Sequence, residues 1–326
     1  MLRFFAWLFG TVFLLVLLVA GGLYVAYQHF VGPGPSRANI TVVIPRGSHL
    51  GSIGDRLEQA GVVENGQLFA IGTRLLGNGR PLQAGEYEFA GGGSAREVML
   101  QMIEGRTVKR RLTIPEGLTV SEIVDLVRQA EGLEGDLPDT GKLSEGSLLP
   151  ETYFYSWGDS RSGMVERMQG AMEKLLAELW ADRAAKLPLA APLDAVTLAS
   201  IVEKETAVPD ERPRVAAVFY NRLARGMKLQ SDPTVIYALT EGKAPLGRPL
   251  AHADLDLASP YNTYVAPGLP PGPIANPGRA SLLAVLHPLT TQELYFVADG
   301  SGGHAFATTI DEHNRNVAKW RKLNQP

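Results

Sequence analysis

Along most of the chain, hydrophobic and polar positions are interspersed, as in amphipathic helices and strands. The first thirty residues differ, because a helix formed by them would have no polar face. From Phe4 to Tyr27, 24 consecutive residues carry no formal charge. As a helix this run would span about 36 Å, more than the roughly 30 Å hydrocarbon layer of a bilayer. The apolar core of a cleaved signal peptide is shorter. We therefore predict a membrane anchor over residues 1–30 and a Pro/Gly-rich linker over residues 31–38.

Charges flanking the anchor predict its orientation. Arg3 and the terminal amine lie before the apolar run, whereas no formal charge follows it until Arg37. Because cytoplasmic flanks are enriched in basic residues, we expect a cytoplasmic N-terminus and an external remainder. The protein would then cross the cytoplasmic (inner) membrane once, with its larger part on the periplasmic side of a Gram-negative cell. The chain has no cysteine, which excludes disulfides and thiolate metal sites but leaves the compartment open.

Residues 39–155 show the pattern of a small α+β module. Two segments have the same local pattern, which predicts a strand, a tight turn and an amphipathic helix. They begin at Ile44-Pro-Arg-Gly47 and at Ile114-Pro-Glu-Gly117. Either a duplicated unit or the same turn chemistry used twice explains this repeat. Between the two segments, residues 83–89 alternate like a strand and Ser94 is placed to cap a helix. Nothing in the module has a catalytic pattern.

Residues 156–326 predict a mainly helical domain that ends with a β-hairpin and a last helix. One helix is predicted from Asp194, a plausible N-cap, to Val208, before Pro209. Leu198, Ile201, Val202 and Glu205 share its apolar face, as the i, i+3, i+4, i+7 spacing requires.

Glu205 is the candidate acid of this domain. A carboxyl group on an apolar face, near the negative end of a helix, should have a raised pKa. A proton retained near neutral pH is what a general acid needs. The alternative interpretation is a partly buried Glu205 that forms an ion pair with Arg212 or Arg222. On helix geometry alone this structural interpretation is favoured.

A second catalytic carboxylate is hard to find. Glu203 projects roughly 160° away from Glu205 around the helix, and Asp232 is better explained as an N-cap before Pro233. Glycosidases that work through water or a covalent intermediate need two carboxylates flanking the bond. A single acid therefore favours glycosidic cleavage in which the substrate supplies the nucleophile.

The Pro/Gly-rich stretch over residues 259–278 is the other candidate binding region. It cannot form long regular elements, and a long loop inside a compact domain is often functional. Tyr261, Asn262 and Tyr264 suit stacking on sugars and hydrogen bonding to them, although a purely structural loop explains them equally well.

Several classes of function are disfavoured. The net charge of −3 provides no argument for nucleic-acid binding. The histidines lack metal-ligand spacing, and there is no phosphate-binding glycine loop followed by lysine. We therefore expect neither a metal nor a cofactor.

Several motifs in this order resemble the endolytic murein transglycosylases of the MltG/YceG-like family. The most specific are Ala199-Ser-Ile-Val-Glu-Lys-Glu-Thr-Ala207, Val218–Leu223, Leu229–Tyr237, Tyr261–Tyr264 with Gly268–Gly272, and Leu294–Gly300 with His304. Gly146–Tyr153 resembles the segment that precedes the catalytic domain in the family. The resemblance covers nearly everything after the anchor. The stretch from Glu241 to Ala253 is longer than usual, which leaves the conformation of that loop open.

The resemblance implies a LysM-like module near the membrane, at residues 39–155, and a lysozyme-like catalytic domain at residues 156–326. The family's catalytic glutamate, followed by threonine, falls on Glu205. Gln230, Tyr261 and Asn262 correspond to positions lining the glycan groove, to which we add Tyr264. The implied reaction cleaves the MurNAc–GlcNAc β-1,4 bond within nascent strands and leaves 1,6-anhydroMurNAc ends.

The family also implies peptidoglycan glycan strands as substrate, a role in glycan-length control and peptidoglycan synthases as partners. Two other functions remain as alternatives. One is a non-catalytic glycan-binding scaffold that recruits synthases, and the other is a hydrolytic muramidase, which would need a second carboxylate across the groove.

Overall fold

Helices dominate the fold, and the strands form small pairs. The computed structural model describes residues 2–323, without the side chains of residues 2, 3 and 6. The charge of Arg3, on which the predicted orientation of the anchor depends, lies outside the described side chains. Within the described range the strands form three two-stranded sheets. The α+β class predicted from the sequence is therefore confirmed at this level. The chain divides into two compact units.

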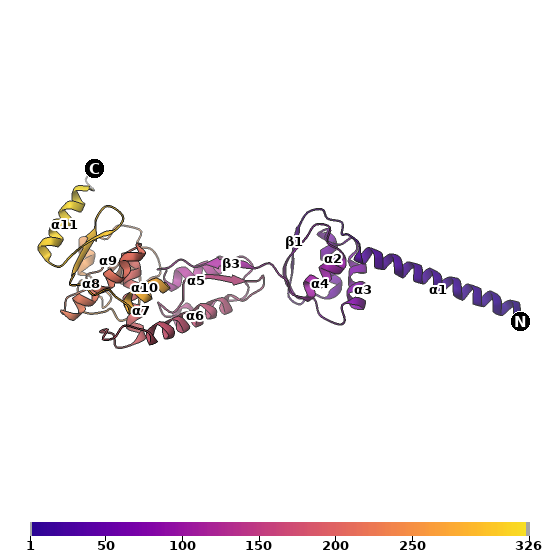
Figure 1. Cartoon of the computed structure of the whole chain (residues 1–326), viewed down its shortest axis with the longest axis horizontal. Coiled ribbons are helices and arrows are strands. Elements are labelled where there is room, and N and C mark those ends of the chain that lie inside the picture. The colour runs from indigo at the N-terminus through magenta and orange to yellow at the C-terminus, as the bar shows by residue number, and fades with distance from the viewer. Residues whose placement is uncertain (1, 324–326) are drawn as a thin grey trace. The chain divides into compact units, whose positions relative to one another are not determined.

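The first unit extends through Arg110 and includes residues 131–133 and 154–159. Its helices and strands are α1 (Leu2–Val31), β1 (Ile40–Ile44), α2 (Leu50–Gln59), α3 (Gly66–Leu76), β2 (Gly85–Phe89) and α4 (Ala95–Ile103) (Figure 1). Strands β1 and β2 are antiparallel, with Ile40 opposite Phe89 and Ile44 opposite Gly85. Helices α2 and α3 approach so closely at Gly54 that a Cβ atom there would lie 2.3 Å from the carbonyl oxygen of Gly66.

The hydrophobic core of the first unit combines its helices with one face of the β1–β2 pair. Ile44, Leu57, Phe69, Tyr87 and Met102 are each at most 1% exposed. Ser94 forms a capping box with Glu97 at the start of α4, as predicted. Helix α1 contains the segment Trp7–Val31, which is long and apolar enough to span a membrane.

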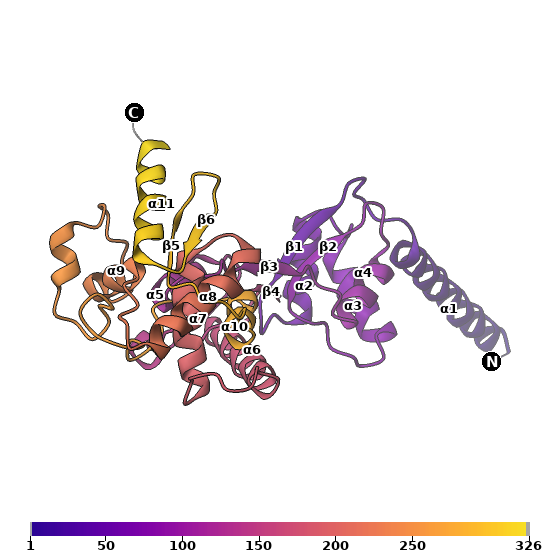
Figure 2. The same cartoon turned by 60° about the vertical axis from the view of Figure 1, so that its left-hand side comes forward.

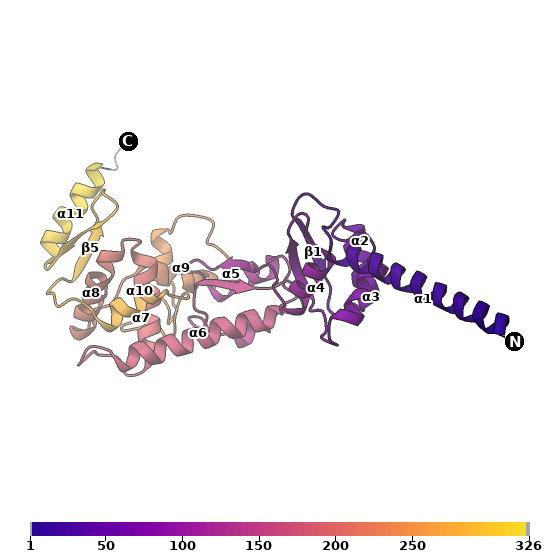
Figure 3. The ribbon, with the colours of Figure 1, turned by 45° about the vertical axis from the view of Figure 1, so that its right-hand side comes forward.

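The second unit contains most of the remaining chain. Strands β3 (Arg110–Thr113) and β4 (Thr152–Tyr155) lie partly in it, since Arg110 and residues 154–155 belong to the first unit. The elements wholly within it are α5 (Val120–Gln129), η1 (Thr140–Lys142), α6 (Arg161–Ala181), α7 (Pro192–Glu205), η2 (Pro209–Glu211), α8 (Arg212–Ala224), α9 (Asp232–Thr240), η3 (His252–Asp256), α10 (Arg279–Leu286), β5 (Tyr295–Ala298), β6 (His304–Ala307) and α11 (Ile310–Leu323). Helix α6 runs beside α5 (Figure 3). The predicted hairpin is confirmed as the antiparallel β5–β6 pair, against which α11 packs (Figure 2).

Helix α7 forms the centre of this unit and packs against α6, α8 and α10. Every residue from Ala195 to Val202 is buried. The prediction that Asp194 is its N-cap was wrong, because the N-cap is Ala191. Asp194 instead accepts hydrogen bonds from the amides of Ala190 and Ala191, at 2.7 and 3.0 Å. Pro192 can occupy the first turn because the amide that proline lacks would have no partner within the helix.

The repeated strand–turn–helix pattern is present in both places where the sequence predicts it. Strand β1 leads into α2 and strand β3 leads into α5. The turns contain Gly47 and Gly117, each with φ of +77°, a conformation that favours glycine. The helices bury Leu57 and Val127 completely. The same local structure is therefore formed twice, which both a duplication and repeated turn chemistry would produce.

Candidate active site

Glu205 is the last residue of α7. The predicted helix continued to Val208, but it ends three residues earlier because Thr206 has an extended backbone, with φ −140° and ψ 130°. Since α7 is anchored in the core, its last turn places the carboxyl group of Glu205 at a fixed point at the rim of that core. Part of the side chain remains accessible from a neighbouring cavity.

A short segment between α8 and α9 brings a hydroxyl group to this carboxyl. The Ser231 Oγ donates a hydrogen bond to Glu205 Oε1 at 2.5 Å. Gln230, immediately before it, has a φ of +53°, which is uncommon for a residue with a side chain. Thr263 holds this conformation, because its carbonyl accepts from the Gln230 amide at 3.1 Å and its hydroxyl accepts from the Ser231 amide at 3.0 Å.

The cavity beside Glu205 has a volume of about 440 Å³. Its lining combines charged and polar side chains with aromatic and aliphatic ones. The residues that line it are Glu205, Arg222, Leu229, Gln230, Asp232, Tyr264, Tyr295, Phe296, Val297, Ile310 and His313. The Tyr264 hydroxyl donates to Asp232 Oδ1 at 2.6 Å. The Arg222 guanidinium lies 5.2 Å from the centre of the Tyr295 ring, and the His313 ring stacks on the same tyrosine.

Burial raises the pKa of Glu205 from an ordinary 4.5 to about 7. The hydrogen bond from Ser231 opposes this shift, because it stabilises the charged form. The nearby negative charge of Asp232 raises the pKa further, while the positive charges of His304 and Arg222 lower it. Near neutral pH a substantial fraction of Glu205 is therefore protonated, as a general acid requires.

Neither arginine proposed as an ion-pair partner binds Glu205. Arg212 contacts Glu203 instead, at 3.0 Å, in a pair whose side chains are 10% and 5% exposed. Arg222 donates to the carbonyl oxygens of Leu294 and Leu229 at 2.6 and 2.8 Å. Glu205 forms no ion pair with another described residue. The structural interpretation of this carboxyl was therefore wrong, because both guanidinium groups are used elsewhere.

The predicted binding residues divide into two groups. Gln230 and Tyr264 line the cavity with Glu205. Tyr261 does not line it, and its ring packs against Tyr237 with 4.9 Å between centres. Asn262 does not line it either and is fully buried. Its amide group supports the surrounding loop by donating to the carbonyls of Leu255 and Leu257 and accepting from the Tyr264 amide.

Several residues around Glu205 had no predicted role in the site: Ser231, which contacts its carboxyl group, and the cavity residues Asp232, Tyr295 and His313. Ser231 and Asp232 adjoin Gln230 within one motif, so their neighbourhood was visible in the sequence. Asp232 was predicted as an N-cap, but the N-cap of α9 is Ser231, which leaves the Asp232 carboxylate free to face the cavity. Tyr295 and His313 come from the hairpin and from α11, and no local pattern marks them as site residues.

A second polar cluster lies directly after the acid. The Thr206 hydroxyl donates to Glu211 Oε2 at 3.3 Å, and the same oxygen lies 2.7 Å from His304 Nδ1. The His304 amide also donates to Glu211 Oε1 at 2.8 Å. This cluster connects the end of α7 to strand β6 and so helps to fix the backbone around Glu205. Among residues 2–323, no group of three or more potential metal ligands is found.

The sequence model of the YceG-like family matches residues 42–319, which include every residue of this site. The chain belongs to the YceG-like family. The family resemblance predicted from the motifs is thereby confirmed. An endolytic murein transglycosylase of Streptococcus pneumoniae serotype 2 is 33% identical over 356 aligned positions. That alignment includes 94% of this YceG-like chain and 63% of the pneumococcal protein, so the chain spans less than two thirds of that relative.

Two further comparisons extend over nearly whole chains. An endolytic murein transglycosylase of Bacillus subtilis strain 168 is 29% identical, with 93% of this chain and 91% of that protein aligned. A crystal structure of a YceG-like protein from Listeria monocytogenes is 32% identical and superposes with a TM-score of 0.52. It covers 86% of this chain and 99% of its own.

Proposed function

We propose that this protein is a membrane-anchored endolytic transglycosylase of peptidoglycan, with Glu205 as its acid. One observation carries the proposal: a carboxyl group with a pKa of about 7 opens into a cavity without a cationic partner for it. Family membership and relatives named endolytic murein transglycosylase support peptidoglycan glycan strands as the substrate.

The proposed reaction uses Glu205 twice. Protonated Glu205 donates its proton to the glycosidic oxygen between MurNAc and GlcNAc, and the bond from that oxygen to C1 breaks. The resulting carboxylate then accepts the proton of the MurNAc C6 hydroxyl, whose oxygen bonds to C1. The product is a 1,6-anhydroMurNAc end, no water is consumed, and Glu205 returns to its protonated state. The attacking hydroxyl belongs to the substrate and needs little further positioning.

Other cavity residues have supporting roles in this proposal. The Asp232 carboxylate adds to the rise that burial causes in the pKa of Glu205, and it can stabilise positive charge that develops at C1. Tyr264 holds Asp232 in place and presents an aromatic face to a sugar ring. Gln230 offers an amide group at the cavity wall. Tyr261 and Asn262 act indirectly, by fixing the loop that carries Tyr264.

We extend the proposal to the rest of the chain. Residues 1–30 anchor the protein in the cytoplasmic membrane, residues 31–38 connect the anchor, and residues 39–155 include a LysM-like module on the periplasmic side. The order β1–α2–α3–β2 with an antiparallel strand pair supports that module. Residues 156–326 form a lysozyme-like catalytic domain. In this arrangement the enzyme cleaves nascent strands beside peptidoglycan synthases and limits glycan length.

Hydrolysis is the second candidate reaction, and the position of Asp232 favours it. Two carboxylates, Glu205 and Asp232, line the same cavity, as a muramidase that activates water requires. The masses of the released ends separate the two reactions, since a hydrolysed end contains one more water than an anhydro end. Anhydro ends from both the wild type and Asp232→Asn support the proposed reaction. Reducing ends that disappear in Asp232→Asn would assign hydrolysis. A protein that binds glycan without cleaving it would be a scaffold.

A further inference from the structure

Helix α3 has an apolar face that no other part of the first unit buries. Its inward side contributes Phe69 and Thr73 to the interior of the unit. On the outward side, Ile71 is 58% and Leu75 is 70% exposed. Together with the partly buried Leu68 they follow the i, i+3, i+7 spacing of a continuous helical stripe. Contiguous exposed apolar surface of sufficient area is a feature of protein and membrane interaction sites.

This stripe lies next to the end of α1. Phe30, in the last turn of α1, is 2% exposed and packs against α3 at Gly72, where a Cβ atom would lie 2.4 Å from the ring. In Figures 1 and 3, α3 lies at the end of the first unit from which α1 emerges, while β1 lies at the opposite end. The end of α1 is therefore packed directly against α3.

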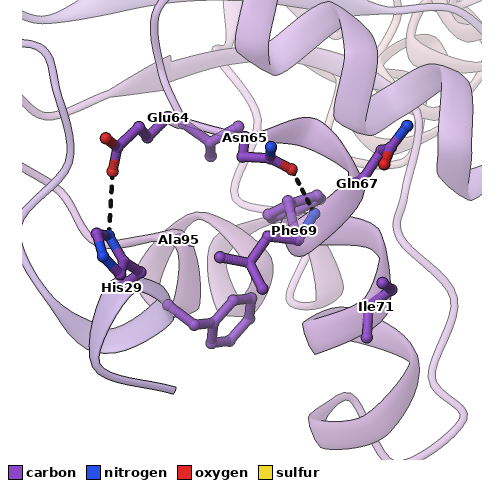
Figure 4. Close-up of a pocket in the computed structure, with 10 residues that line it drawn as sticks. His29, Glu64, Asn65, Gln67, Phe69, Ile71 and Ala95 are labelled. Carbon is purple, nitrogen blue, oxygen red and sulfur yellow. Dashed lines mark hydrogen bonds and ion pairs between the residues drawn. The ribbon is translucent and has the colours of Figure 1, made fainter. Parts of the chain in front are cut away.

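The chain just after α1 is also held in place. The Gly34 amide donates to the carbonyl of Gly92 at 3.1 Å, and the Gly92 amide donates to the carbonyl of Ser36 at 2.6 Å. His29 Nδ1 lies 3.2 Å from Glu64 Oε2 (Figure 4). Because these contacts tie the segment to the unit on both sides of its prolines, α3 keeps a defined position relative to the end of α1.

A cavity of about 600 Å³ is lined by residues from the last turn of α1, from α3 and from the segment just before α3 (Figure 4). Its apolar lining residues are Phe30, Val63, Leu68, Phe69, Ile71 and Ala95, and its polar ones are His29, Glu64, Asn65 and Gln67. Apolar side chains beside polar groups at the end of a membrane-spanning helix match the boundary between acyl chains and headgroups.

Two arginines add positive charge, Arg74 in the last turn of α3 and Arg80 in the loop that follows the helix. Arg74 and Arg80 line a second cavity, of about 330 Å³, and neither forms an ion pair with another described residue. The buried hydroxyl of Thr73 at the same cavity has no hydrogen-bond partner among the described residues. Arginine binds phosphate well, and basic residues beside a membrane span are attracted to anionic lipids.

We propose that α3 is an interfacial helix, with Leu68, Ile71 and Leu75 in the headgroup boundary of the bilayer that α1 spans and Arg74 and Arg80 at lipid phosphates. The inference depends on the proposed membrane anchor. It adds that the first unit contacts the membrane surface at a second place besides the anchor.

Because the chain contains no cysteine, single cysteines can report the position of each part. The full chain, reconstituted in vesicles of phosphatidylethanolamine and phosphatidylglycerol, would carry an environment-sensitive fluorophore at Leu75→Cys. Phe13→Cys in α1 tests the anchor, and Thr41→Cys, exposed on β1, is the aqueous control. For each label, fluorescence quenching is measured with two quenchers: a nitroxide attached to lipid and iodide in the aqueous phase.

The proposal predicts that lipid nitroxide quenches the labels at Phe13 and Leu75 at least three times more strongly than the label at Thr41. Quenching at Phe13, with Leu75 resembling Thr41, would overturn the inference and leave the anchor intact. No quenching at Phe13 would overturn the anchor and the inference together. Protection of Leu75 from iodide by purified peptidoglycan, without lipid quenching, would assign the face to glycan instead.

The arginines have their own test in the same vesicles. Lipid quenching at Leu75 should fall at least twofold when Arg74 and Arg80 are both replaced by glutamine, or when phosphatidylglycerol is replaced by phosphatidylcholine. Lysine at both positions should restore most of the effect, because it keeps the charge. Identical quenching in all these cases would contradict the predicted phosphate contacts.

Discussion

The Ser231 hydroxyl donates a 2.5 Å hydrogen bond to Glu205, the residue with which α7 ends. The two residues lie 26 positions apart. Their contact depends on the left-handed backbone of Gln230 and on the Thr263 hydrogen bonds that hold it. This hydrogen bond limits how far burial raises the pKa of the acid, so the carboxyl can both donate and accept a proton near neutral pH.

Removing that hydrogen bond should move the pH dependence of activity upward. In Ser231→Ala the charged form of Glu205 loses a donor, so its pKa rises above about 7 and the decline of activity on the alkaline side shifts to higher pH. The measurement is the rate of glycan cleavage between pH 5 and pH 9. Ser281→Ala is the matched control, because the buried Ser281 hydroxyl has no hydrogen-bond partner among the described residues. An unshifted profile in Ser231→Ala would contradict this role.

Neutralising Asp232 should move the same profile in the opposite direction. The Asp232 charge raises the pKa of Glu205, so Asp232→Asn lowers that pKa and the alkaline decline begins at lower pH. A parallel pH titration of the two variants checks the opposite signs directly. Shifts of the same sign would mean that the electrostatic account of the acid is wrong.

The raised pKa of Glu205 has a consequence for stability. The folded protein binds the Glu205 proton up to about pH 7 and the unfolded chain only up to about pH 4.5. Folding therefore loses stability as the pH rises between those values, by roughly 3 kcal/mol in total. In Glu205→Gln this loss is absent. We expect the variant to exceed the wild type in free energy of unfolding by roughly 3 kcal/mol at pH 8 and by little at pH 4.5.

Urea unfolding at the two pH values measures this difference. A Glu205→Gln variant that is less stable than the wild type at pH 8 would contradict the predicted burial of a charged group.

The neighbouring Glu203 provides a matched contrast. It accepts hydrogen bonds from Arg212 and from the Gly278 amide, both at 3.0 Å. Glu203→Gln leaves the guanidinium of Arg212 without its closest counter-charge, so the free energy of unfolding at pH 8 should fall by about 3 kcal/mol. The same chemical change two residues apart would thus have opposite effects on stability. Equal effects in urea unfolding would show that the two carboxyls have similar environments.

The sequence predicted those parts of the site that depend on local periodicity. Glu205 was identified because it continues the apolar face of Leu198, Ile201 and Val202, all of which are buried. The β5–β6 hairpin followed from alternating residues around a Gly-rich turn. The exact end of α7 was not predictable, because Thr206 leaves the helix to contact Glu211, which belongs to tertiary structure.

Local sequence patterns could not predict the contacts between segments that are distant in the chain. The partners of Arg212 and Arg222 could not be assigned, because helix geometry shows that they lie near α7 but not which oxygen atoms they bind. Asn262 resembles a sugar-binding residue in composition, yet its amide is used by three backbone groups of its own loop. Asp232 had the sequence pattern of an N-cap, a role that Ser231 takes by lying one residue earlier.

The most direct test of the account is digestion of purified peptidoglycan by the full-length protein, with mass spectrometry of the released ends for the wild type, Glu205→Gln and Ser281→Ala. We predict 1,6-anhydroMurNAc ends from the wild type and from Ser281→Ala, and a loss of at least 10²-fold in Glu205→Gln, as expected when a general acid is removed. Undiminished release of anhydro ends by Glu205→Gln would contradict the central claim.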